Sequence, residues 1–328
     1  MGLSNEHEQS MISNGAHKAY DIVGDIHGCY QSLVALLDRL GYVKDDGVYR
    51  HVDRKMIFLG DFIDRGPAQH EVIDTVRRMI EAGTALAVMG NHEFNAIAYA
   101  SPDPKSGNYL RPHSDKNRRQ HQAFLEAYVD DSKGYAKAIE WFKTLPLWLD
   151  LGNLRVVHAC WDSGMIRRIE DVHGSQYLYQ DLLYAASQRS AWQFGAIETI
   201  LKGKEIPLGE GASFRDKDGN RRHHIRVRWW DKDATTYRQA FMGPESVIAH
   251  IPEDDIGTEH LLEYAHDEPP LFFGHYWLEG ELGPLTNNIA CVDYSVAKPG
   301  GRLVAYRWNG ERVLSKDRFV WVDRQEVA

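Results

Sequence analysis

The sequence predicts an α/β protein in which two stacked mixed β-sheets are flanked by helices and carry a cap insertion. Three observations support this fold class. The first half of the chain alternates short apolar runs with segments of helical periodicity, the last quarter is a series of strand-like runs, and a long polar segment lies between them. A chain of 328 residues, 43% of them hydrophobic, can bury one sizeable core with insertions.

Each apolar run in the first half is a candidate strand, and most are followed by a candidate helix. The expected strands are 19–24, 55–60, 85–90 and 154–159, and the expected helices are 32–42, 70–83 and one that begins near 93. This alternation is typical of a parallel or mixed sheet with helices on both faces and right-handed connections.

The second half of the chain changes character. Residues 162–270 are polar, helical in places over 177–201 and strongly charged over 214–233, so we expect a cap without a large core of its own. From residue 271 onward, four runs predict a second, largely antiparallel sheet: "LFFGHYW", "NIACVDYS", "RLVAYRWNG" and "FVWV". We therefore expect a flexible tail over 1–18 and one domain over 19–328.

Composition excludes several classes of function. The net charge of −9 argues against bulk binding to nucleic acid or to anionic membranes, and no apolar run approaches the length of a membrane span. The first 18 residues lack the apolar stretch of a secretory signal. Three widely spaced cysteines do not suggest a disulfide framework, which favours a reducing, cytoplasmic location.

Polar clusters follow the expected strands of the first half: "GDIHG" (24–28), "GDFIDRG" (60–66), "GNHE" (90–93) and "VVHA" (156–159). Loops at the carboxyl ends of parallel strands converge on one edge of a sheet, where ligands bind. The side chains that can meet there are Asp25, His27, Asp61, Asp64, Arg65, Asn91, His92 and His158, and the later run "FFGHYW" adds His275.

Carboxylates, imidazoles and an amide oxygen without a thiolate cluster suit divalent Mn, Fe, Co, Ni or Zn. This set is too large for one ion, but it suits two ions that share a bridging carboxylate. Such a pair lowers the pKa of a bound water and holds the oxygens of an in-line displacement at phosphorus. Arg65 can bind phosphate oxygens, His92 can protonate a leaving oxygen, and Asp64 can orient His92.

The three blocks "GDIHG", "GDFIDRG" and "GNHE", in this order and at this spacing, resemble the phosphoprotein phosphatase (calcineurin-like) family of metallophosphoesterases. The resemblance is strong over residues 20–160 and weak over 271–300. It implies that Asp25 and His27 hold one metal and that Asp61 bridges. It further implies a second metal on Asn91, His158 and His275, phosphate contacts from Arg65 and Asn91, and an acid pair of His92 with Asp64.

The chain departs from the family pattern in ways that leave the metal ligands intact and point to a bacterial-type member. "VHACWD" replaces the two glycines that follow the fourth-motif histidine in eukaryotic members, and Cys29 stands where many members have glutamine. In "GHYW", a tyrosine replaces the small residue that usually follows the last histidine. The segment 162–270 has no counterpart that aligns. The second phosphate-binding arginine of the family has three candidates: Arg226, Arg228 and Arg238.

Several features have a second interpretation. His250 is the rival of His275 as a ligand. The basic stretch 215–228 is interpreted either as a solvated hairpin or as a segment that binds an anionic substrate. The segment "NRRQHQ" (117–122) is a weaker candidate for binding an anionic substrate. The tryptophans read as core or as a platform for a nucleotide base: Trp161, Trp192, Trp229, Trp230 and Trp277.

The sequence thus predicts a hydrolase of phosphomonoesters, specifically a serine/threonine-type protein phosphatase, in which a hydroxide bridging two metal ions attacks phosphorus directly. Manganese is the expected metal, and the expected partner is a phosphorylated protein or a small phosphoester. The alternative is a dinucleoside polyphosphate hydrolase acting on diadenosine tetraphosphate, with the cap enclosing the base. A non-catalytic metal-dependent binding protein is the remote alternative, because a binder needs no acid pair.

Overall fold

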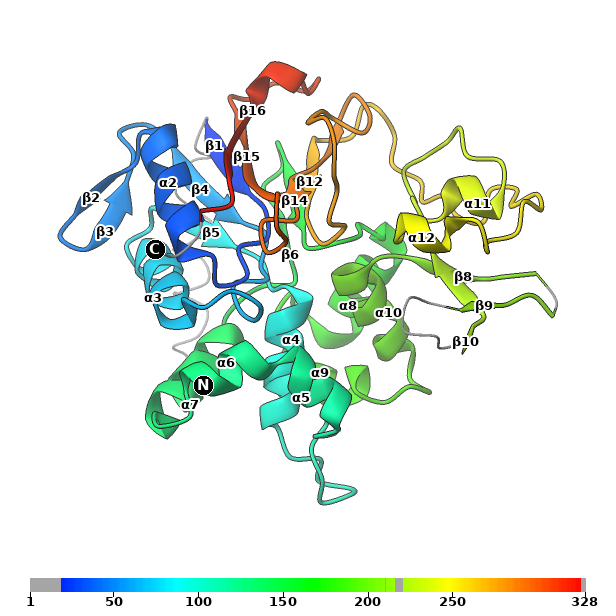
Figure 1. The fold of residues 1–328 in the computed structure, drawn as a ribbon, viewed down its shortest axis with the longest axis horizontal. Helices are drawn as coiled ribbons and strands as arrows, with labels where there is room; N and C mark the ends of the chain where they lie inside the picture. The colour runs from blue at the N-terminus through cyan, green and yellow to red at the C-terminus, as the bar shows by residue number, and fades with distance from the viewer. Residues whose placement is uncertain (1–18, 210, 216–220, 326–328) are drawn as a thin grey trace.

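A computed structural model describes residues 19–209, 211–215 and 221–325 of the chain. It shows two β-sheets in one α/β unit with helices packed around them (Figure 1). The expected flexible tail over 1–18 and the turn of the expected hairpin at 216–220 lie outside the described residues. Among the helices of the described part, none is long and apolar enough to cross a membrane.

The first sheet is mixed and has six strands: β1 (Tyr20–Val23), β4 (Lys55–Phe58), β5 (Ala85–Ala87), β14 (Asp293–Tyr294), β15 (Arg302–Trp308) and β16 (Phe319–Asp323). β1, β4 and β5 are parallel, and β15 is antiparallel to β1, β14 and β16. Val23 pairs with Phe58, and Phe58 pairs with Ala87. The loops that follow these three strands therefore leave the sheet at the same edge.

The second sheet has four strands: β6 (Trp148–Asp150), β7 (Arg155–Val157), β12 (Leu271–Phe273) and β13 (Ile289–Cys291). β12 is parallel to both β7 and β13, while β6 and β7 are antiparallel. The expectation of a largely antiparallel second sheet was wrong. Long connections separate β7 from β12 and β12 from β13, and such crossovers bring strands back in parallel.

Two further assignments of strands to sheets were wrong. The run at 154–159 belongs to the second sheet instead of extending the first. The last two runs join the first sheet, because the short link after β14 folds β15 back as its antiparallel neighbour and β16 then pairs with β15. Each sheet is consequently mixed, as the fold class predicted.

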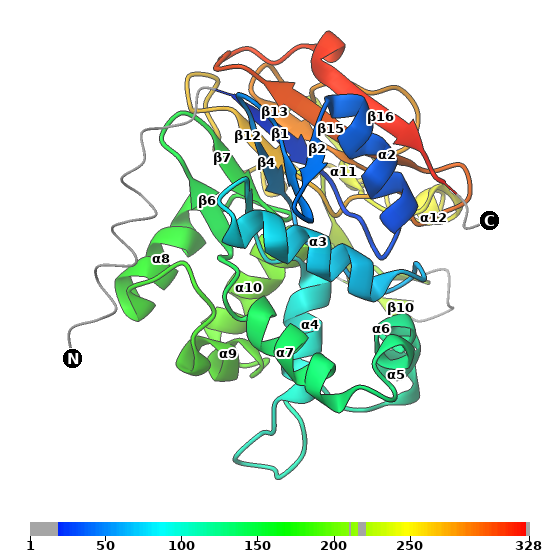
Figure 2. The same cartoon turned by 90° about the vertical axis from the view of Figure 1, so that its left-hand side faces the viewer.

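Figure 2 shows most of the helices below this pair of sheets. α2 buries Leu33, Leu36, Leu37 and Leu40 at helical spacing and ends at Gly41, whose φ of 85° closes the helix. The main helices are α2 (Tyr30–Leu40), α3 (Gln69–Glu81), α4 (Asn91–Ala100), α5 (Asp115–Gln120), α6 (Gln122–Ala127), α7 (Ser132–Phe142), α8 (Ser163–His173), α9 (Gln180–Ala186) and α10 (Trp192–Lys202).

The core has two layers that follow the alternation of side chains along the strands. Ile22 and Ile57 of the first sheet pack with Val156 and Phe272 of the second, in a cluster between the sheets. Their sequence neighbours, such as Val23, point to the opposite side and join a cluster with the helices. This alternation fixes the two sheets face to face and therefore places the ends of their strands side by side.

The segment 162–270 is built in two parts. Helices α8 to α10 contribute to the main core. The remainder contains β8 (Glu205–Pro207), β9 (Phe214–Arg215), β10 (Arg221–Arg222), β11 (His224–Arg226), α11 (Tyr237–Ala240) and α12 (Glu245–Ile248), with a small hydrophobic cluster of its own. β9 and β10 pair antiparallel, as a hairpin requires. Another antiparallel hairpin, formed by β2 (Val43–Asp45) and β3 (Val48–Arg50), lies between α2 and β4 in the first half of the chain.

Candidate active site

The ends of strands from both sheets bring all nine sequence-predicted side chains to one place. Asp25, Asp61 and Asn91 follow β1, β4 and β5 of the first sheet, whereas His158 and His275 follow β7 and β12 of the second. The site therefore lies where the two sheets meet, and neither sheet supplies it alone.

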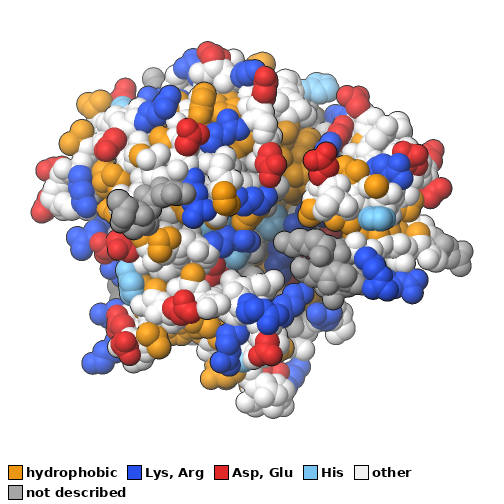
Figure 3. Space-filling view, in the orientation of Figure 1, with side chains coloured by type: hydrophobic (Ala, Val, Ile, Leu, Met, Phe, Trp, Pro, Cys, Tyr) orange, Lys and Arg blue, Asp and Glu red, His pale blue; other side chains and the backbone are white. Residues whose placement is uncertain are grey.

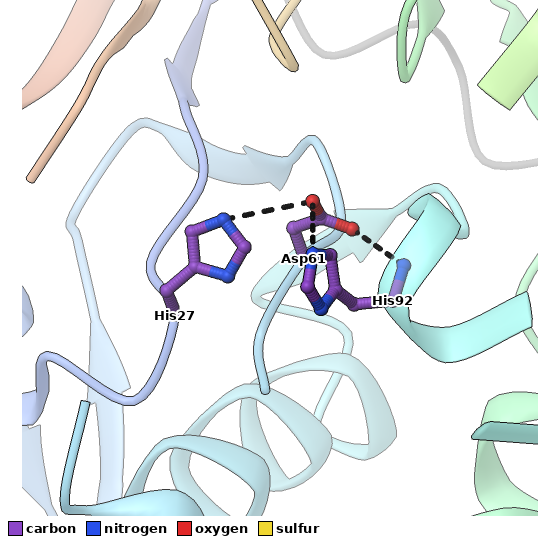
Figure 4. A group of neighbouring side chains, drawn as sticks. All are labelled: His27, Asp61 and His92. Carbon is purple, nitrogen blue, oxygen red and sulfur yellow. Dashed lines mark hydrogen bonds and ion pairs between the residues drawn. The ribbon is translucent and has the colours of Figure 1, made fainter. Parts of the chain in front are cut away.

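Asp61 lies at the centre of the site. Its Oδ2 is 3.6 Å from His27 Nε2, 3.5 Å from His158 Nε2 and 3.9 Å from His92 Nε2. Figure 4 shows His27 and His92 on two sides of the Asp61 carboxylate. Two three-residue groups with metal-ligand spacing share this aspartate: His27, Asp61 and His92, and Asp61, His158 and His275.

The histidines are held so that one nitrogen of each faces this centre. His27 Nδ1 donates to the carbonyl oxygen of Ile63 at 2.9 Å, and His158 Nδ1 donates to that of Leu59 at 2.6 Å. These bonds leave Nε2 of both rings available as a ligand atom. His27 Nε2 and both ring nitrogens of His275 are buried without a hydrogen-bond partner among the described residues, as a site built for a cation requires.

The buried carboxylates also fit a bound cation. Burial raises the pKa of Asp25 well above its usual range, and the neighbouring Asp293 raises it further. Burial and the neighbouring His92 lower the pKa of His27 to about 3, which keeps the ring neutral. Burial opposes the charge on His158, but Asp61 and Asp25 outweigh it and raise the pKa of His158 to about 10. A cation between these groups would compensate the carboxylates in place of that proton.

Asp25 and Asn91 lie at the same centre with different contacts. Asn91 Oδ1 is 3.2 Å from His158 Nε2. The Asp25 carboxylate accepts the backbone N–H of His275 at 3.2 Å from Oδ2, and it belongs to neither of the three-residue groups found among the described residues. Gly274 permits this contact, because a Cβ there would lie 2.2 Å from Asp25 Oδ1.

His92 and Asp64 form a hydrogen-bonded pair beside the centre. His92 Nδ1 lies 2.5 Å from Asp64 Oδ2, which leaves His92 Nε2 facing Asp61. Burial opposes the charge on His92, but Asp61 and Asp64 outweigh it and raise its pKa. Burial raises the pKa of Asp64, but hydrogen bonds from His121 and His92 outweigh it and hold that pKa well below its usual range. The pair can therefore keep a proton on His92.

Arg65 reaches the site from the same loop as Asp61 and Asp64. Its guanidinium carbon lies 3.9 Å from the ring centroid of Trp277, so a cation–π contact holds the side chain. Trp277 is oriented in turn by Asp293, whose Oδ2 accepts the Trp277 backbone N–H at 2.7 Å. Neither contact could be predicted from the sequence, because Trp277 and Asp293 lie far from Arg65 along the chain.

A cleft of about 1710 Å³ runs from this centre between α5 and the cap. Eight basic side chains line it: Arg65, Arg111, Lys116, Arg119, Lys202, Arg221, Arg222 and Arg226. Four acidic side chains lie with them: Asp61, Asp64, Glu126 and Glu205. Figure 3 shows Lys and Arg side chains gathered around the hollow in the middle of this face. The lining is therefore cationic in a protein whose net charge is −9.

The cleft separates the alternatives that the sequence left open. Arg226 lines it, whereas Arg228 lines a different cavity and Arg238 is bonded to the Ile251 carbonyl and to Glu253. His250 is exposed and belongs to neither metal-ligand group of the described chain. Of the five tryptophans considered as a platform for a base, Trp277 lines the cleft, and Trp161, Trp229 and Trp230 are buried in the core. The fifth, half-buried Trp192, packs under Arg168.

The structure adds two residues that sequence reasoning missed. Glu93 is fully buried, and its carboxylate accepts the backbone N–H groups of Asp61 and Phe62 at 2.8 and 2.9 Å. The motif "GNHE" contained this residue, but its contacts depend on the approach of two loops. His121 lies 3.0 Å from Asp64 Oδ1 through its Nδ1. Its segment, 117–122, was noted only for its basic charge.

Comparisons with known proteins give a family match and similar proteins from bacteria. The family model described as calcineurin-like phosphoesterase matches residues 20–276. A Bacillus subtilis protein named as the asymmetrical bis(5'-nucleosyl)-tetraphosphatase PrpE is 44% identical over 146 residues, which are 43% of this chain and 57% of that protein. A protein of the same name from Halalkalibacterium halodurans is 49% identical over 74 residues, 22% of this chain and 30% of that one. Both matches span less than two thirds of the relatives' length.

Solved structures resemble the fold at low sequence identity. A protein serine/threonine phosphatase from Saccharomyces cerevisiae superimposes with a TM-score of 0.51 at 14% identity, over 98% of this chain and 89% of that one. A cold-active protein tyrosine phosphatase gives a TM-score of 0.51 at 18% identity, over 90% of this chain and 78% of that one. At such identities the likeness concerns the fold alone.

Proposed function

The chain belongs to the calcineurin-like phosphoesterase family, and from this premise we propose that it hydrolyses dinucleoside polyphosphates such as diadenosine tetraphosphate. This was the alternative in the sequence interpretation. The names of the bacterial relatives support it better than the main prediction of a serine/threonine-type protein phosphatase. The structural neighbours named as protein phosphatases support only the fold.

The cationic cleft is the observation that carries the proposal. A phosphomonoester places one phosphate at the metal centre and does not extend along the cleft. Lys202 and Arg226 are paired there with Glu198 and Glu205. Arg111 donates to the amide oxygens of Asn95 and Gln120, and Arg221 donates to the hydroxyl of Ser213. These neutral acceptors orient the guanidinium groups without neutralising them. A chain of several phosphates extending from the centre would supply the matching charge.

We expect two divalent metal ions, with manganese as the preferred ion, held around Asp61. Asp25, His27 and Asp61 would hold one, and Asp61, Asn91, His158 and His275 the other. Bound there, the ions would activate water and stabilise the charge that develops on phosphate oxygens. Arg65, fixed against Trp277, would bind phosphate oxygens together with Asn91. His92 would protonate the leaving oxygen from Nε2, because its Nδ1 is bonded to Asp64.

The test is the activity of the Mn-reconstituted protein on diadenosine tetraphosphate, a phosphopeptide and p-nitrophenyl phosphate in parallel, with the products separated. We expect the dinucleotide to have the highest kcat/KM, with AMP and ATP as products of asymmetrical cleavage. His92→Ala should lower kcat, and it should do so more for the phosphopeptide, whose leaving alkoxide is strongly basic, than for the dinucleotide, whose leaving oxygen belongs to a phosphate. Faster turnover of the phosphopeptide than of the dinucleotide would refute the proposal and restore the protein phosphatase prediction.

Variants of the cleft add a second arm to this test. Arg111→Ala and Arg221→Ala should each raise KM for the dinucleotide about tenfold and leave KM for p-nitrophenyl phosphate unchanged. Lys133→Ala is the matched control, because it removes an exposed charge on α7 outside the cleft lining. Equal KM changes for both substrates would mean that the cleft does not bind the phosphate chain.

A further inference from the structure

The carboxylate of Asp64 is shared by two histidines. Its Oδ2 lies 2.5 Å from His92 Nδ1, and its Oδ1 lies 3.0 Å from His121 Nδ1. Asp64 is 2% exposed and His121 is 4% exposed, so both contacts are shielded from water. The acid pair seen in the sequence is thus the inner part of a three-residue chain, His92, Asp64 and His121.

The ring of His121 is fixed by its surroundings. His121 connects α5 and α6, and its backbone N–H donates to the carbonyl oxygens of Asn117 and Arg118. The ring centroid lies 5.4 Å from that of Tyr99 and 5.0 Å from that of Phe124. Packing therefore determines where Nδ1 lies. The other nitrogen, Nε2, is buried at the cleft and has no hydrogen-bond partner among the described residues.

The Asp64 carboxylate needs such a second anchor. The Asp64 backbone is fixed, because its N–H donates to Gln69 Oε1 at 2.8 Å and its φ is 68°. The torsion that turns a carboxylate about its last bond is broad, however, so backbone contacts do not orient the two oxygens. With Oδ1 bonded to His121, Oδ2 is held toward His92.

We propose that His121 is a positioning residue of this enzyme, which holds the Asp64 carboxylate so that His92 presents its proton to the leaving oxygen. The inference rests on the proton-donor role proposed above for His92. It does not depend on whether the physiological substrate is a dinucleotide. A poorly stabilised leaving oxygen needs the proton most, so the effect of His121 should grow with the basicity of the leaving group.

The experiment compares phenyl phosphate, which has a basic leaving group, with p-nitrophenyl phosphate, which has a weakly basic one. His121→Ala should lower kcat for phenyl phosphate about tenfold to a hundredfold and kcat for p-nitrophenyl phosphate by less than about threefold, with KM unchanged for both. His121→Asn should restore much of the loss, because an amide N–H can reach Asp64 Oδ1. His113→Ala is the matched control, since His113 stacks on the same Tyr99 at 3.7 Å without touching Asp64.

NMR spectroscopy of the metal-free protein tests the contacts of Asp64 with His92 and His121 without measuring turnover. With histidine labelled by ¹⁵N, we expect downfield imidazole N–H protons from His92 and His121, both bonded to Asp64, in addition to that of His173, which lies 2.6 Å from Asp181. His121→Ala should remove one and move that of His92 upfield, and His121→Asn should return the His92 proton toward its original position. If His121→Ala lowered kcat equally for both esters, or left the chemical shift of the His92 N–H proton unchanged, the proposal would be overturned. If His92→Ala itself lowers both esters equally, the proton-donor role fails, which separates the two hypotheses.

Discussion

Backbone strain is concentrated in the residues of the site. Five of the converging residues have positive φ angles although none is glycine: His27 at 47°, Asp61 at 51°, Asp64 at 68°, Arg65 at 69° and His275 at 72°. Such conformations cost about 1 kcal/mol for a residue with a Cβ and persist where the surroundings enforce them. Here hydrogen bonds between the loops hold the backbone, since the N–H of His27 donates to the carbonyl oxygen of Asp61 and the N–H of Asp61 donates to Glu93. The motif "GDFIDRG" indicated a tight loop, but not that its charged residues would carry the strain.

Trp277 offers a test of how Arg65 is held. Trp277→Ala removes a cation–π contact worth about 1 kcal/mol, so we expect KM for p-nitrophenyl phosphate to rise roughly fivefold with kcat nearly unchanged. Steady-state kinetics of the metal-loaded enzyme measures this change. Trp321→Ala is the control, because Trp321 makes the same kind of contact with Arg39 on another face. A KM unaffected by Trp277→Ala would show that Arg65 does not need the indole.

His158 predicts a pH dependence for the metal-free protein. Its folded-state pKa of about 10 lies above the ordinary value of 6.5, so its proton contributes stability below pH 6.5 that is lost as pH rises toward 10. Urea unfolding after chelation should show the free energy of unfolding falling by at most about 1.4 kcal/mol per pH unit across this window. His158→Asn should flatten the slope, and a steeper fall in the variant would contradict the assignment.

At the scale of elements, the first turn of α4 supplies site residues and contacts the loop after β4. The helix begins at Asn91, so its first turn carries Asn91 and His92, and Glu93 turns back to the loop after β4. Gly90 lets that loop approach, since a Cβ there would lie 2.2 Å from Asp61 Oδ1. The sequence predicted the helix from its periodicity, but the contact between two loops depends on the pairing of β4 with β5.

The close approach at Gly90 therefore predicts that a larger residue there weakens metal binding at the site. Gly90→Ala should displace Asp61 and weaken manganese binding at least about tenfold, as measured by isothermal titration calorimetry. The φ of Gly90 is −91°, so the added Cβ acts through its contacts and not through backbone strain. Gly195→Ala in α10, where nothing lies within 4 Å of the added Cβ, should leave binding unchanged. Similar losses in both variants would point to general destabilisation.

At the scale of the molecule, the charge of the cleft has the opposite sign to the net charge of the chain. The chain has a net charge of −9, yet the cleft lining holds eight basic and four acidic side chains among the described residues. An acidic exterior with a cationic cleft favours small polyanions over anionic polymers and surfaces, because the long-range field repels an extended anion while the cleft attracts a short one. The net charge alone indicated that extended anions are repelled, but not that the cleft attracts short ones.

This distribution predicts a salt effect that depends on the substrate. Raising sodium chloride from low to physiological ionic strength should lower kcat/KM for diadenosine tetraphosphate about tenfold and for p-nitrophenyl phosphate about twofold. The double variant with Arg111→Ala and Arg221→Ala should show a smaller difference between the two substrates. Equal salt dependence of both substrates in the unmodified protein would mean that the distal basic residues do not attract the phosphate chain.

The sequence by itself determined the chemistry of the centre, because residue types placed directly after strands depend only on local order. Asp25, Asp61 and Asn91 could be expected at one edge once their strands were recognised as parallel. Only the tertiary structure decided that His158 and His275 come from a second sheet, that His121 lies against Asp64, and that a basic cleft extends from Asp61. These features depend on how long connections return through space, and neither periodicity nor spacing along the chain encodes that path.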